Sequence, residues 1–350
     1  MSRLYIVDTT LRDGEQTAGV SFAKDEKLKI AVALADLGVD IIEVGIPAMS
    51  AREREVIREI NELHLSSELL VWNRMSISDV KLSIETGVQQ LHITVPASDL
   101  HMQKKLGITR KELIKRMNET ISFAIEKGCK VSVGAEDASR TELNFLIQLY
   151  KEAVSQGAHR VRYADTVGRL DPFSTYHIIR SIKEEIGVDI DFHGHNDLGM
   201  GTANALAAYK GGAGYISCSV NGLGERAGNT PLEEIVTAIR YVEGCEEKMK
   251  MKKIMTVSKM VEKYSGRKVQ DSKPIVGKEV FSHEAGIHVD GLLKDILTYE
   301  EISPEIFGRH RKIVLGKHSG KHAIKHDYQK RGIVISDAEV EQILKELRQG

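Results

Sequence analysis

Short runs of β-branched and other apolar residues alternate with longer amphipathic stretches along the first 245 residues. This alternation is typical of repeated βα units. The eight predicted strands are 4–8, 41–44, 69–72, 90–95, 130–134, 160–164, 189–193 and 215–219. A helix is predicted after each of them, over 24–37, 51–63, 80–85, 110–126, 141–155, 172–185, 199–210 and 231–241. Eight such repeats predict an α/β fold, a closed (β/α)8 TIM barrel, whose usual length is roughly 250 residues.

The alternative architecture is a doubly wound open sheet. Such a sheet usually has fewer strands and a glycine-rich first turn. The first turn of this chain, residues 8–16, is polar and charged instead. The pattern therefore favours the closed barrel.

The pattern changes after about Gly244. The segments that follow are a charge-rich stretch at 246–253, a helix at 254–264, a Gly- and His-rich segment at 276–291 and a final helix at 337–347. We therefore predict a (β/α)8 barrel over 1–245 and a smaller, mainly helical C-terminal subdomain over 246–350.

The composition is that of an ordinary globular protein, with 41% hydrophobic and 28% charged residues. Lys plus Arg (49) nearly balances Asp plus Glu (50), so no overall charge favours nucleic acid or an anionic membrane as a partner. No export signal and no apolar run long enough to span a membrane are visible. Cys129, Cys218 and Cys245 are widely spaced, and we interpret them as reduced thiols of a cytoplasmic protein.

In a TIM barrel the functional groups lie at the carboxyl ends of the strands. The polar residues that follow the predicted strands are Asp8, Arg12, Asp13, Glu15, Gln16, Asn73, Arg74, Glu136, Asp137, Arg140, Asp165, Thr166, the run 193–197 and the segment 221–229. The opposite strand ends carry nothing comparable. The sequence therefore predicts an active site at the carboxyl-end face.

His193 and His195 have the i, i+2 spacing that places two side chains on one face of a strand. Two imidazoles and one carboxylate leave open positions on a divalent metal, as a Lewis-acid catalyst needs. In a closed barrel Asp13 and Asn229 can converge on the two histidines. A pair of hydrogen-bonded core histidines is the alternative, and the position at a strand end favours the metal, which this donor set allows to be Mg, Mn or Zn.

Three further features have both a functional and a structural interpretation. Arg12 can stabilise an oxyanion or form a surface salt bridge, and Glu136 can orient a base or mark the entry to a helix. The glycine-rich segment 221–229 can offer backbone N–H groups to an anion, although glycine loops are common. His288 lies in a segment dense in groups able to move protons, but a solvated loop histidine is the default.

Taken together, the motifs resemble the acetyl-CoA-condensing branch of the metallolyase barrels, the family of 2-isopropylmalate, homocitrate and citramalate synthases. The matching stretches are DTTLRDGEQ at 8–16, ADTVG at 164–168, HGHNDLG at 193–199, NGLGERAGN at 221–229, GIH at 286–288 and LGKHSG at 315–320. The resemblance covers nearly the whole chain. It implies condensation of acetyl-CoA with a small 2-oxo acid, followed by hydrolysis of the thioester.

The resemblance also implies roles for individual residues. The metal ligands would be Asp13, His193 and His195, with Asn229 at or near the metal. The 2-oxo acid would be bound and polarised by Arg12, with Gln16 and Thr166 in the same pocket. The acetyl methyl would be deprotonated with the help of His288, coupled to Glu136, with Tyr299 beside that histidine. A homodimer is implied as well, with the C-terminal region reaching toward the partner barrel.

Within the family the sequence most resembles the homocitrate synthases of nitrogen fixation, which use 2-oxoglutarate. A chain that ends at 350 also leads us to expect no leucine-sensing domain. The homocitrate synthases of lysine biosynthesis differ, with Glu at the position of Asp13 and an arginine and a serine at the positions of Ser132 and Gly134. In those enzymes the arginine and the serine bind the distal carboxylate of 2-oxoglutarate. Because both are missing here, Arg74 is our candidate for this role.

Other activities remain as alternatives to homocitrate synthesis. Isopropylmalate synthase would use 2-oxoisovalerate, and citramalate synthase would use pyruvate. A lyase of the same barrel superfamily and a non-enzymatic binding subunit are further from the motif set, since the His288 segment and the uninterrupted group of Arg12, Asp13, His193 and His195 argue against them.

Overall fold

The computed structural model describes residues 3–244 and 249–349, and these residues form two compact units. The first unit comprises Met1–Lys250 together with Thr256–Lys268, and the second comprises Met251–Met255 together with Val269–Gly350. Each unit is described by itself. The boundary expected at residue 246 stays a prediction, and the structure groups Thr256–Lys268 with the barrel.

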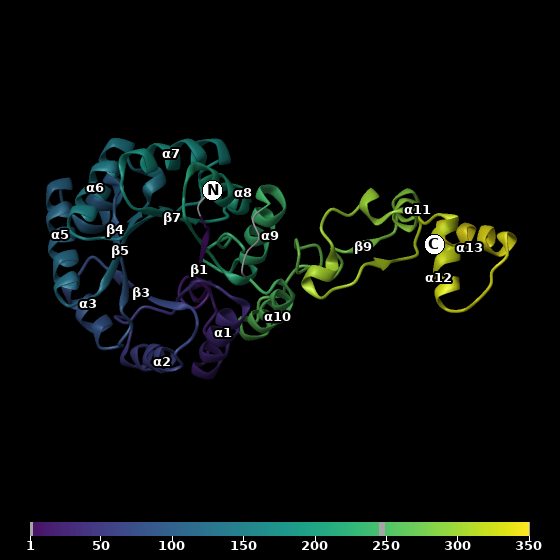
Figure 1. The fold of residues 1–350 in the computed structure, drawn as a ribbon, viewed down its shortest axis with the longest axis horizontal. Helices are drawn as coiled ribbons and strands as arrows, with labels where there is room; N and C mark the ends of the chain where they lie inside the picture. The colour runs from purple at the N-terminus through teal and green to yellow at the C-terminus, as the bar shows by residue number, and fades with distance from the viewer. Residues whose placement is uncertain (1–2, 245–248, 350) are drawn as a thin grey trace. The chain divides into compact units, whose positions relative to one another are not determined.

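The first unit is a closed barrel of eight parallel strands, as the sequence predicted. The strands are β1 (Tyr5–Asp8), β2 (Ile41–Glu43), β3 (Glu68–Arg74), β4 (Gln90–Pro96), β5 (Lys130–Glu136), β6 (Arg160–Asp165), β7 (Asp189–Gly194) and β8 (Tyr215–Cys218). Each strand pairs with the next in the sequence, and β1 closes the barrel on β8 with Tyr5 opposite Tyr215. Figure 1 shows the helices surrounding this ring of strands on the outside.

The helices of the first unit follow the predicted order. They are α1 (Lys24–Leu37), α2 (Ala51–Glu62), α3 (Ile77–Ile84), α4 (Asp99–His101), α5 (Arg110–Glu126), α6 (Leu143–Ser155), α7 (Pro172–Glu185), α8 (Gly201–Gly211), α9 (Leu232–Glu243) and most of α10 (Ile254–Ser265). Short helical turns are η1 (Gly14–Gln16), the π-helix η2 (Met102–Leu106), η3 (Ala138–Arg140) and η4 (Val220–Gly222). Among the described helices, none has the length and apolar character needed to cross a bilayer.

Local sequence explains where these elements begin and end. Helix α7 begins after Asp171, whose carboxylate accepts hydrogen bonds from the backbone N–H groups of Phe173 and Ser174, and Pro172 occupies the first turn. Strand β3 extends past the predicted apolar run to Arg74. The reason is that a parallel ladder is formed by backbone N–H and C=O groups, which polar and apolar residues both have.

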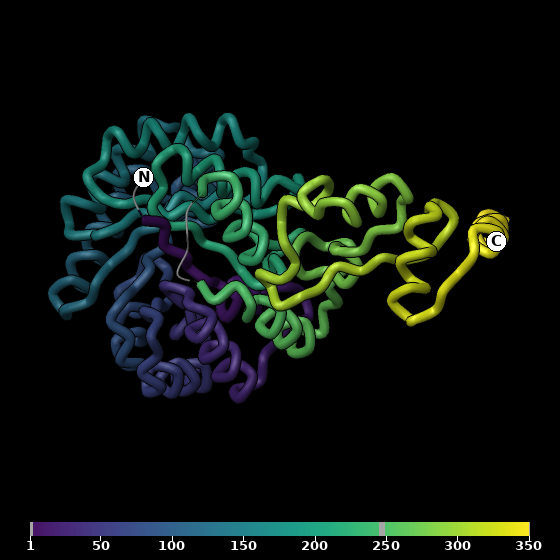
Figure 2. The backbone as a smooth tube through the Cα atoms, turned by 45° about the vertical axis from the view of Figure 1, so that its right-hand side comes forward, coloured from purple at the N-terminus to yellow at the C-terminus, as the bar shows by residue number. Residues whose placement is uncertain are grey.

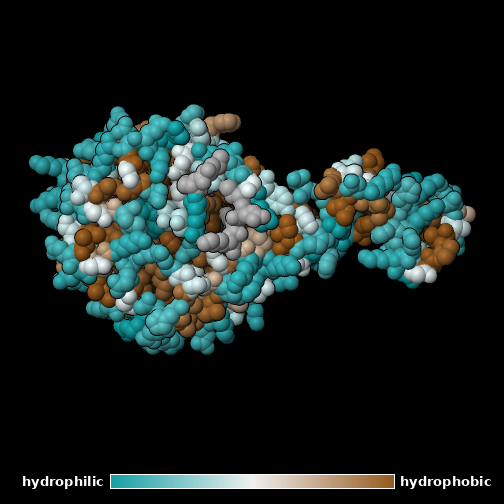
Figure 3. All heavy atoms as spheres, viewed as in Figure 1, coloured by the Kyte–Doolittle hydropathy of each residue, from teal (hydrophilic) through white to brown (hydrophobic). Residues whose placement is uncertain are grey.

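The barrel core is apolar between strands and helices, and its cysteines are part of it. Ile30, Leu34 and Leu37 of α1 are fully buried, as the helical spacing of apolar residues predicts. Cys129 and Cys218 are buried, whereas Cys245 lies outside the described residues. On the face drawn in Figure 3 hydrophilic side chains predominate, with smaller hydrophobic areas between them.

The second unit is mainly helical. Its elements are η5 (Met251–Lys253), β9 (Ser282–His283), α11 (Gly286–Lys294), η6 (Ile296–Thr298), η7 (Pro304–Phe307), β10 (Lys312–Ile313), α12 (Lys321–Lys330) and α13 (Asp337–Gln349). The short strands β9 and β10 pair in parallel, and Ile324, Val340 and Leu344 form a small core between α12 and α13. Figure 2 follows the path of this unit to its yellow end at α13.

Candidate active site and metal centre

A cavity of about 260 Å³ lies at the carboxyl ends of the barrel strands. Its lining residues are Arg12, Asp13, Gln16, Trp72, His92, Thr94, Gly134, Glu136, Arg162, Ala164, Thr166, His193, His195, Glu225 and Arg226. Most barrel residues that the sequence placed in the active site are therefore brought together. Because parallel strands end on one side of a barrel, segments far apart in the chain meet here.

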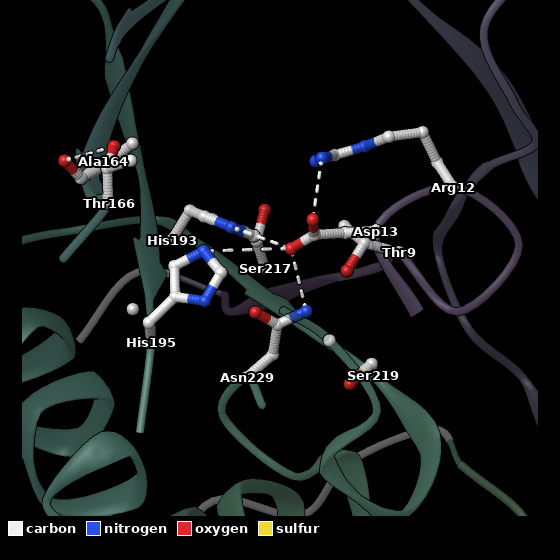
Figure 4. A network of polar contacts seen from close by, with 12 residues as sticks. Thr9, Arg12, Asp13, Ala164, Thr166, His193, His195, Ser217, Ser219 and Asn229 are labelled. Atoms are coloured by element: carbon white, nitrogen blue, oxygen red, sulfur yellow. Dashed lines mark hydrogen bonds and ion pairs between the residues drawn. The ribbon is translucent and has the colours of Figure 1, made fainter. Parts of the chain in front are cut away.

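Asp13, His193 and His195 form a buried group of one carboxylate and two imidazoles. Their side chains are exposed by only 4%, 6% and 6%. The Nε2 atom of His193 lies 3.2 Å from Asp13 Oδ2, and the Nε2 atom of His195 lies 3.8 Å from the same oxygen. In Figure 4 the carboxylate of Asp13 faces the two imidazole rings.

These separations suit a metal ion. Zinc binds histidine nitrogen and carboxylate oxygen at about 2.0–2.2 Å, so neighbouring ligand atoms in a tetrahedral or octahedral shell lie roughly 3.0–3.5 Å apart. The 3.2 Å separation of His193 from Asp13 lies within this range and the 3.8 Å separation of His195 slightly above it, and one ligand atom from each residue lies within 4.8 Å of the others. The donor set therefore fits a divalent cation and leaves coordination positions for a substrate.

Asn229 orients the carboxylate of this group. Its Nδ2 donates to Asp13 Oδ2 at 2.8 Å and to the carbonyl of Leu223 at 3.0 Å. This approach requires glycine at position 224, because a Cβ there would lie 2.6 Å from Asn229 Nδ2. In this orientation the Asn229 amide acts on Asp13 through its N–H group, next to the candidate metal position.

The protonation states also match those of metal ligands. Burial alone would raise the pKa of Asp13, but the Arg12 guanidinium and the hydrogen bond with His193 hold it well below its ordinary value. Burial and the neighbouring His193 lower the pKa of His195 to about 4. At neutral pH Asp13 is therefore charged and His195 is neutral, as metal binding requires.

A chain of buried ion pairs leads from Arg12 into the barrel. Arg12 Nη1 lies 3.1 Å from Asp13 Oδ1, and Arg12 Nε donates to Glu43 Oε1 at 2.6 Å. Glu43 Oε2 in turn accepts from Arg162 Nη1 at 2.8 Å, and Arg162 Nε donates to Asp191 Oδ2 at 2.7 Å. Arg12 is therefore held by two carboxylates beside the candidate metal group.

Sequence reasoning missed Glu43, Arg162 and Asp191. A signal was available, because each is a charged residue within a predicted apolar strand or beside one. Asp191 is also two residues before His193, so strand alternation places the two side chains on the same face. Trp72 and His92 were missed as well, although both line the cavity.

Other predicted residues line the same cavity. Lys105 Nζ lies 2.9 Å from both carboxylate oxygens of Glu136. Thr166 Oγ1 accepts a hydrogen bond of 2.8 Å from the backbone N–H of Asp137. Gln16 ends η1 and lines the cavity. Glu136, Thr166 and Gln16 therefore line the same cavity as Arg12 and Asp13.

Arg74 does not line the cavity, contrary to the role expected for it. Its Nε and Nη2 donate to the two oxygens of Asp79 at 2.7 and 2.9 Å, and its side chain is 68% exposed. Asp79 lies in the first turn of α3, where a carboxylate is favoured by the helix dipole, and it draws the guanidinium outward.

The segment 221–229, for which the sequence left an anion site and an ordinary glycine loop as alternatives, has a structural role. Several of its backbone N–H groups are used inside the protein. Gly222 donates to Ser219, Gly224 to Thr17 Oγ1, Gly228 to Glu225 and Asn229 to Gly222. The glycines therefore allow a tight loop that positions Asn229.

In the second unit His288 and Tyr299 lie together. Their rings stack with centroids 4.2 Å apart and an interplanar angle of 23°. A Cβ at position 291 would lie 2.6 Å from the Tyr299 ring, so Gly291 leaves room for this contact. His288 and Tyr299 are both exposed.

The first unit is an eight-stranded parallel barrel with a buried group of one carboxylate and two imidazoles at its mouth. This combination is typical of metal-dependent barrel enzymes. Comparison with known proteins gives the same class. Residues 3–261 match the family model described as HMGL-like, and residues 275–350 match the model described as homocitrate synthase post-HMGL domain-like. The chain belongs to the HMGL-like family, and it is an enzyme.

Curated relatives cover almost all of the chain. It is 48% identical over 345 residues to 2-isopropylmalate synthase 2 of Caldanaerobacter subterraneus, covering 99% of this chain and 90% of that protein. It is 43% identical over 349 residues to homocitrate synthase 1 of a Nostoc species, covering 100% and 93%. It is 43% identical over 344 residues to the (R)-citramalate synthase of Methanocaldococcus jannaschii, covering 98% and 70%. These three names occur at similar identity, so the comparisons define the family and leave the 2-oxo acid open.

Solved structures support the fold. The HMG-CoA lyase of Bacillus subtilis superposes with a TM-score of 0.69 at 19% sequence identity, covering 77% of this chain and 96% of that one. At this identity the likeness concerns the barrel architecture alone.

Proposed function

We propose that this enzyme condenses the acetyl group of acetyl-CoA with a small 2-oxo acid and hydrolyses the resulting thioester. The observation that carries the proposal is the buried group of Asp13, His193 and His195 beside Arg12 in the barrel cavity. The names of the curated relatives support it, since 2-isopropylmalate, homocitrate and citramalate synthases all form products of such condensations.

A divalent cation held by Asp13, His193 and His195 would supply Lewis acidity toward the 2-oxo group. Residues of the chain itself bind and orient the substrate. Arg12 has two nitrogens fixed by carboxylates, so its remaining donor is held in place for the oxygen that gains charge as the carbon–carbon bond forms. Thr166 and Gln16 orient the substrate in the same cavity.

The methyl group of a thioester is a weak carbon acid, and its deprotonation needs a positioned base. We assign this step to His288, with Tyr299 stacked against it and Glu136 as the orienting carboxylate. A homodimer is part of the same proposal, with the C-terminal unit of one chain serving the barrel of the other.

The substrate we propose is 2-oxoglutarate, which makes the enzyme a homocitrate synthase and agrees with the resemblance to the nitrogen-fixation type. Support comes from polar groups in the cavity wall, His92, Thr94 and Arg162. An apolar side chain, such as that of 2-oxoisovalerate, would leave buried polar groups without partners, which a selective site avoids.

The test is release of free CoA from acetyl-CoA by the metal-loaded protein with a panel of 2-oxo acids. We expect 2-oxoglutarate to give the highest kcat/KM. Faster turnover of 2-oxoisovalerate would indicate isopropylmalate synthase, and pyruvate as the best substrate would indicate citramalate synthase. No CoA release with any 2-oxo acid would contradict the proposal.

A substitution links the activity to the site. Arg12→Lys keeps the charge but offers one ammonium group in place of a fork that reaches both Glu43 and Asp13. We expect kcat to fall about 100-fold, the usual size for loss of one oxyanion donor. The matched control is Arg116→Lys, at an exposed ion pair with Glu112, which should leave kcat unchanged.

A mixing experiment tests the role of His288 across subunits. Arg12→Ala and His288→Ala chains are each expected to be nearly inactive. If the C-terminal unit serves the partner barrel, mixed dimers contain one intact site, and mixing the two inactive proteins restores part of the activity. A His288→Ala protein with full activity would remove His288 from the proposal.

A further inference from the structure

We propose that Arg162 determines the specificity of the enzyme by binding the distal carboxylate of a dicarboxylic 2-oxo acid through its unpaired Nη2 group. This inference rests on the proposed function. It names the group that distinguishes 2-oxoglutarate from monocarboxylic substrates, a role that Arg74 does not fill.

The first observation is an incomplete set of partners on a buried guanidinium. Arg162 is only 2% exposed and yet lines the cavity. Its Nε is held by Asp191 at 2.7 Å and its Nη1 by Glu43 at 2.8 Å. Its Nη2 is buried and has no hydrogen-bond partner within the part of the chain that the structure describes. Buried donors are nearly always paired, so this one is suited to an acceptor brought by a ligand.

The second observation is the fixed relation between Arg162 and Arg12. One carboxylate, that of Glu43, receives Arg12 Nε on Oε1 and Arg162 Nη1 on Oε2. Arg12 lies next to Asp13, which belongs to the candidate metal group. Arg162 contacts the other carboxylate oxygen of Glu43. Two guanidiniums joined in this way suit a ligand with an anionic acceptor at each end.

The third observation is that the ring of His92 lies against Ser132 and Gly134 of β5. The ring of His92 occupies the space above Gly134, since a Cβ at that position would lie 2.4 Å from His92 Nε2. His92 is tied to Ser132 Oγ through Nδ1 at 2.9 Å. Burial, with the guanidiniums of Arg162 and Arg12, holds the pKa of His92 well below its ordinary value, so the ring is neutral. Arg226 also lines the cavity, but its Nε and Nη2 donate to the two oxygens of Asp197 at 2.7 and 2.8 Å.

The competing explanation is that Arg162 only neutralises Glu43 and Asp191. The two roles differ in what they predict for substrates. A purely structural arginine affects all 2-oxo acids alike, because its loss disturbs Arg12 through Glu43. A carboxylate-binding arginine affects 2-oxoglutarate far more than pyruvate, which has no distal carboxylate.

The experiment uses Arg162→Lys in the full-length, metal-loaded enzyme. Lysine keeps the positive charge between Glu43 and Asp191 but carries it on a single nitrogen, so it cannot contact both carboxylates and also place a donor at the position of Nη2. We expect kcat/KM for 2-oxoglutarate to fall about 10- to 100-fold, mainly through KM, which is the usual cost of one hydrogen bond to a charged group. The kcat/KM for pyruvate should stay within about threefold. Arg180→Lys, at an exposed ion pair with Glu184, is the matched control and should change neither.

Two further measurements make the result independent of turnover and of folding. Calorimetric titration of 2-oxoglutarate should show the same weakening of binding in Arg162→Lys, with pyruvate as the comparison ligand. If Arg162→Lys does not fold, Arg162→Gln combined with Asp191→Asn removes both charges of that pair and gives the same comparison.

The wild-type enzyme should also prefer 2-oxoglutarate to 5-methyl-2-oxohexanoate, in which an isopropyl group replaces the distal carboxylate.

The outcomes separate the two proposals. Equal loss of 2-oxoglutarate and pyruvate activity in Arg162→Lys, with CoA still released by the wild type, overturns the role of Arg162 alone. So does a wild-type enzyme that accepts 5-methyl-2-oxohexanoate as readily as 2-oxoglutarate. Absence of CoA release with every 2-oxo acid overturns the proposed function itself.

Discussion

Glu43→Gln tests the buried bridge between the two arginines. Glu43 has no exposed surface and accepts from Arg12 Nε at 2.6 Å and from Arg162 Nη1 at 2.8 Å. Burial alone would raise the pKa of Glu43, but Arg12 and Arg162 together hold it below its ordinary value, so the group is a carboxylate. Glutamine has the same shape but only one acceptor oxygen, so its amide N–H group must face the N–H of one guanidinium.

The expected cost follows from these contacts. A hydrogen bond to a charged group contributes about 1.5–3 kcal/mol, and removing one partner of a buried ion pair costs about 3–5 kcal/mol. We therefore expect Glu43→Gln to lower the free energy of unfolding by about 3–5 kcal/mol. A change of 1 kcal/mol moves the Tm of a 150–250-residue domain by about 2–4 °C, so the Tm should fall by roughly 6–20 °C.

The assay is thermal unfolding of the full chain by calorimetry. The matched control is Glu185→Gln, which makes the same chemical change in an exposed ion pair with Lys151. Exposed pairs contribute about 0–1 kcal/mol, so its Tm should stay within a few degrees of the wild type. If both variants melt at the same temperature, the bridge through Glu43 contributes no stability and the reasoning is refuted.

Three further predictions concern the metal group and its surroundings. His195→Ala removes one of the three candidate ligands and should weaken binding of Mn²⁺ at least ~100-fold, since loss of a supporting residue alone costs about 10–100-fold; unchanged metal content by elemental analysis would contradict the assignment. Gly224→Ala places a Cβ 2.6 Å from Asn229 Nδ2 and should weaken the same metal about 10–100-fold, whereas Gly187→Ala, with nothing within 4 Å of its Cβ, should not. Because His195 has a pKa of about 4 in the folded protein and about 6.5 when unfolded, the unfolded state binds more protons between these values, and the free energy of unfolding should fall by about 3 kcal/mol as the pH drops through that range. Melting curves of the metal-free protein at about pH 7 and about pH 5, between which about 2 kcal/mol of this change falls, check this, and a Tm that rises on acidification would disprove it.

The sequence by itself determined the barrel and much of its site. All eight strands and the helices after them were predicted within a few residues, because strand alternation and helical periodicity are local patterns that the barrel satisfies in full. The same alternation placed His193 and His195 on one face, and parallel strands of a closed barrel brought Asp13 to them. These inferences need only the order of the strands.

Only the tertiary structure decided which charged side chains meet inside the barrel. Arg162 and Glu43 are 119 residues apart, and their contact depends on the depth of each side chain in the barrel. The position of Arg74 at a strand end suggested that its side chain lines the cavity. The carboxylate of Asp79, at the start of α3, instead draws the guanidinium away from the cavity. Local patterns set the face on which a side chain lies. Competition among neighbours for a buried partner sets where its polar atoms point, because an unpaired buried charge costs more than a change of rotamer.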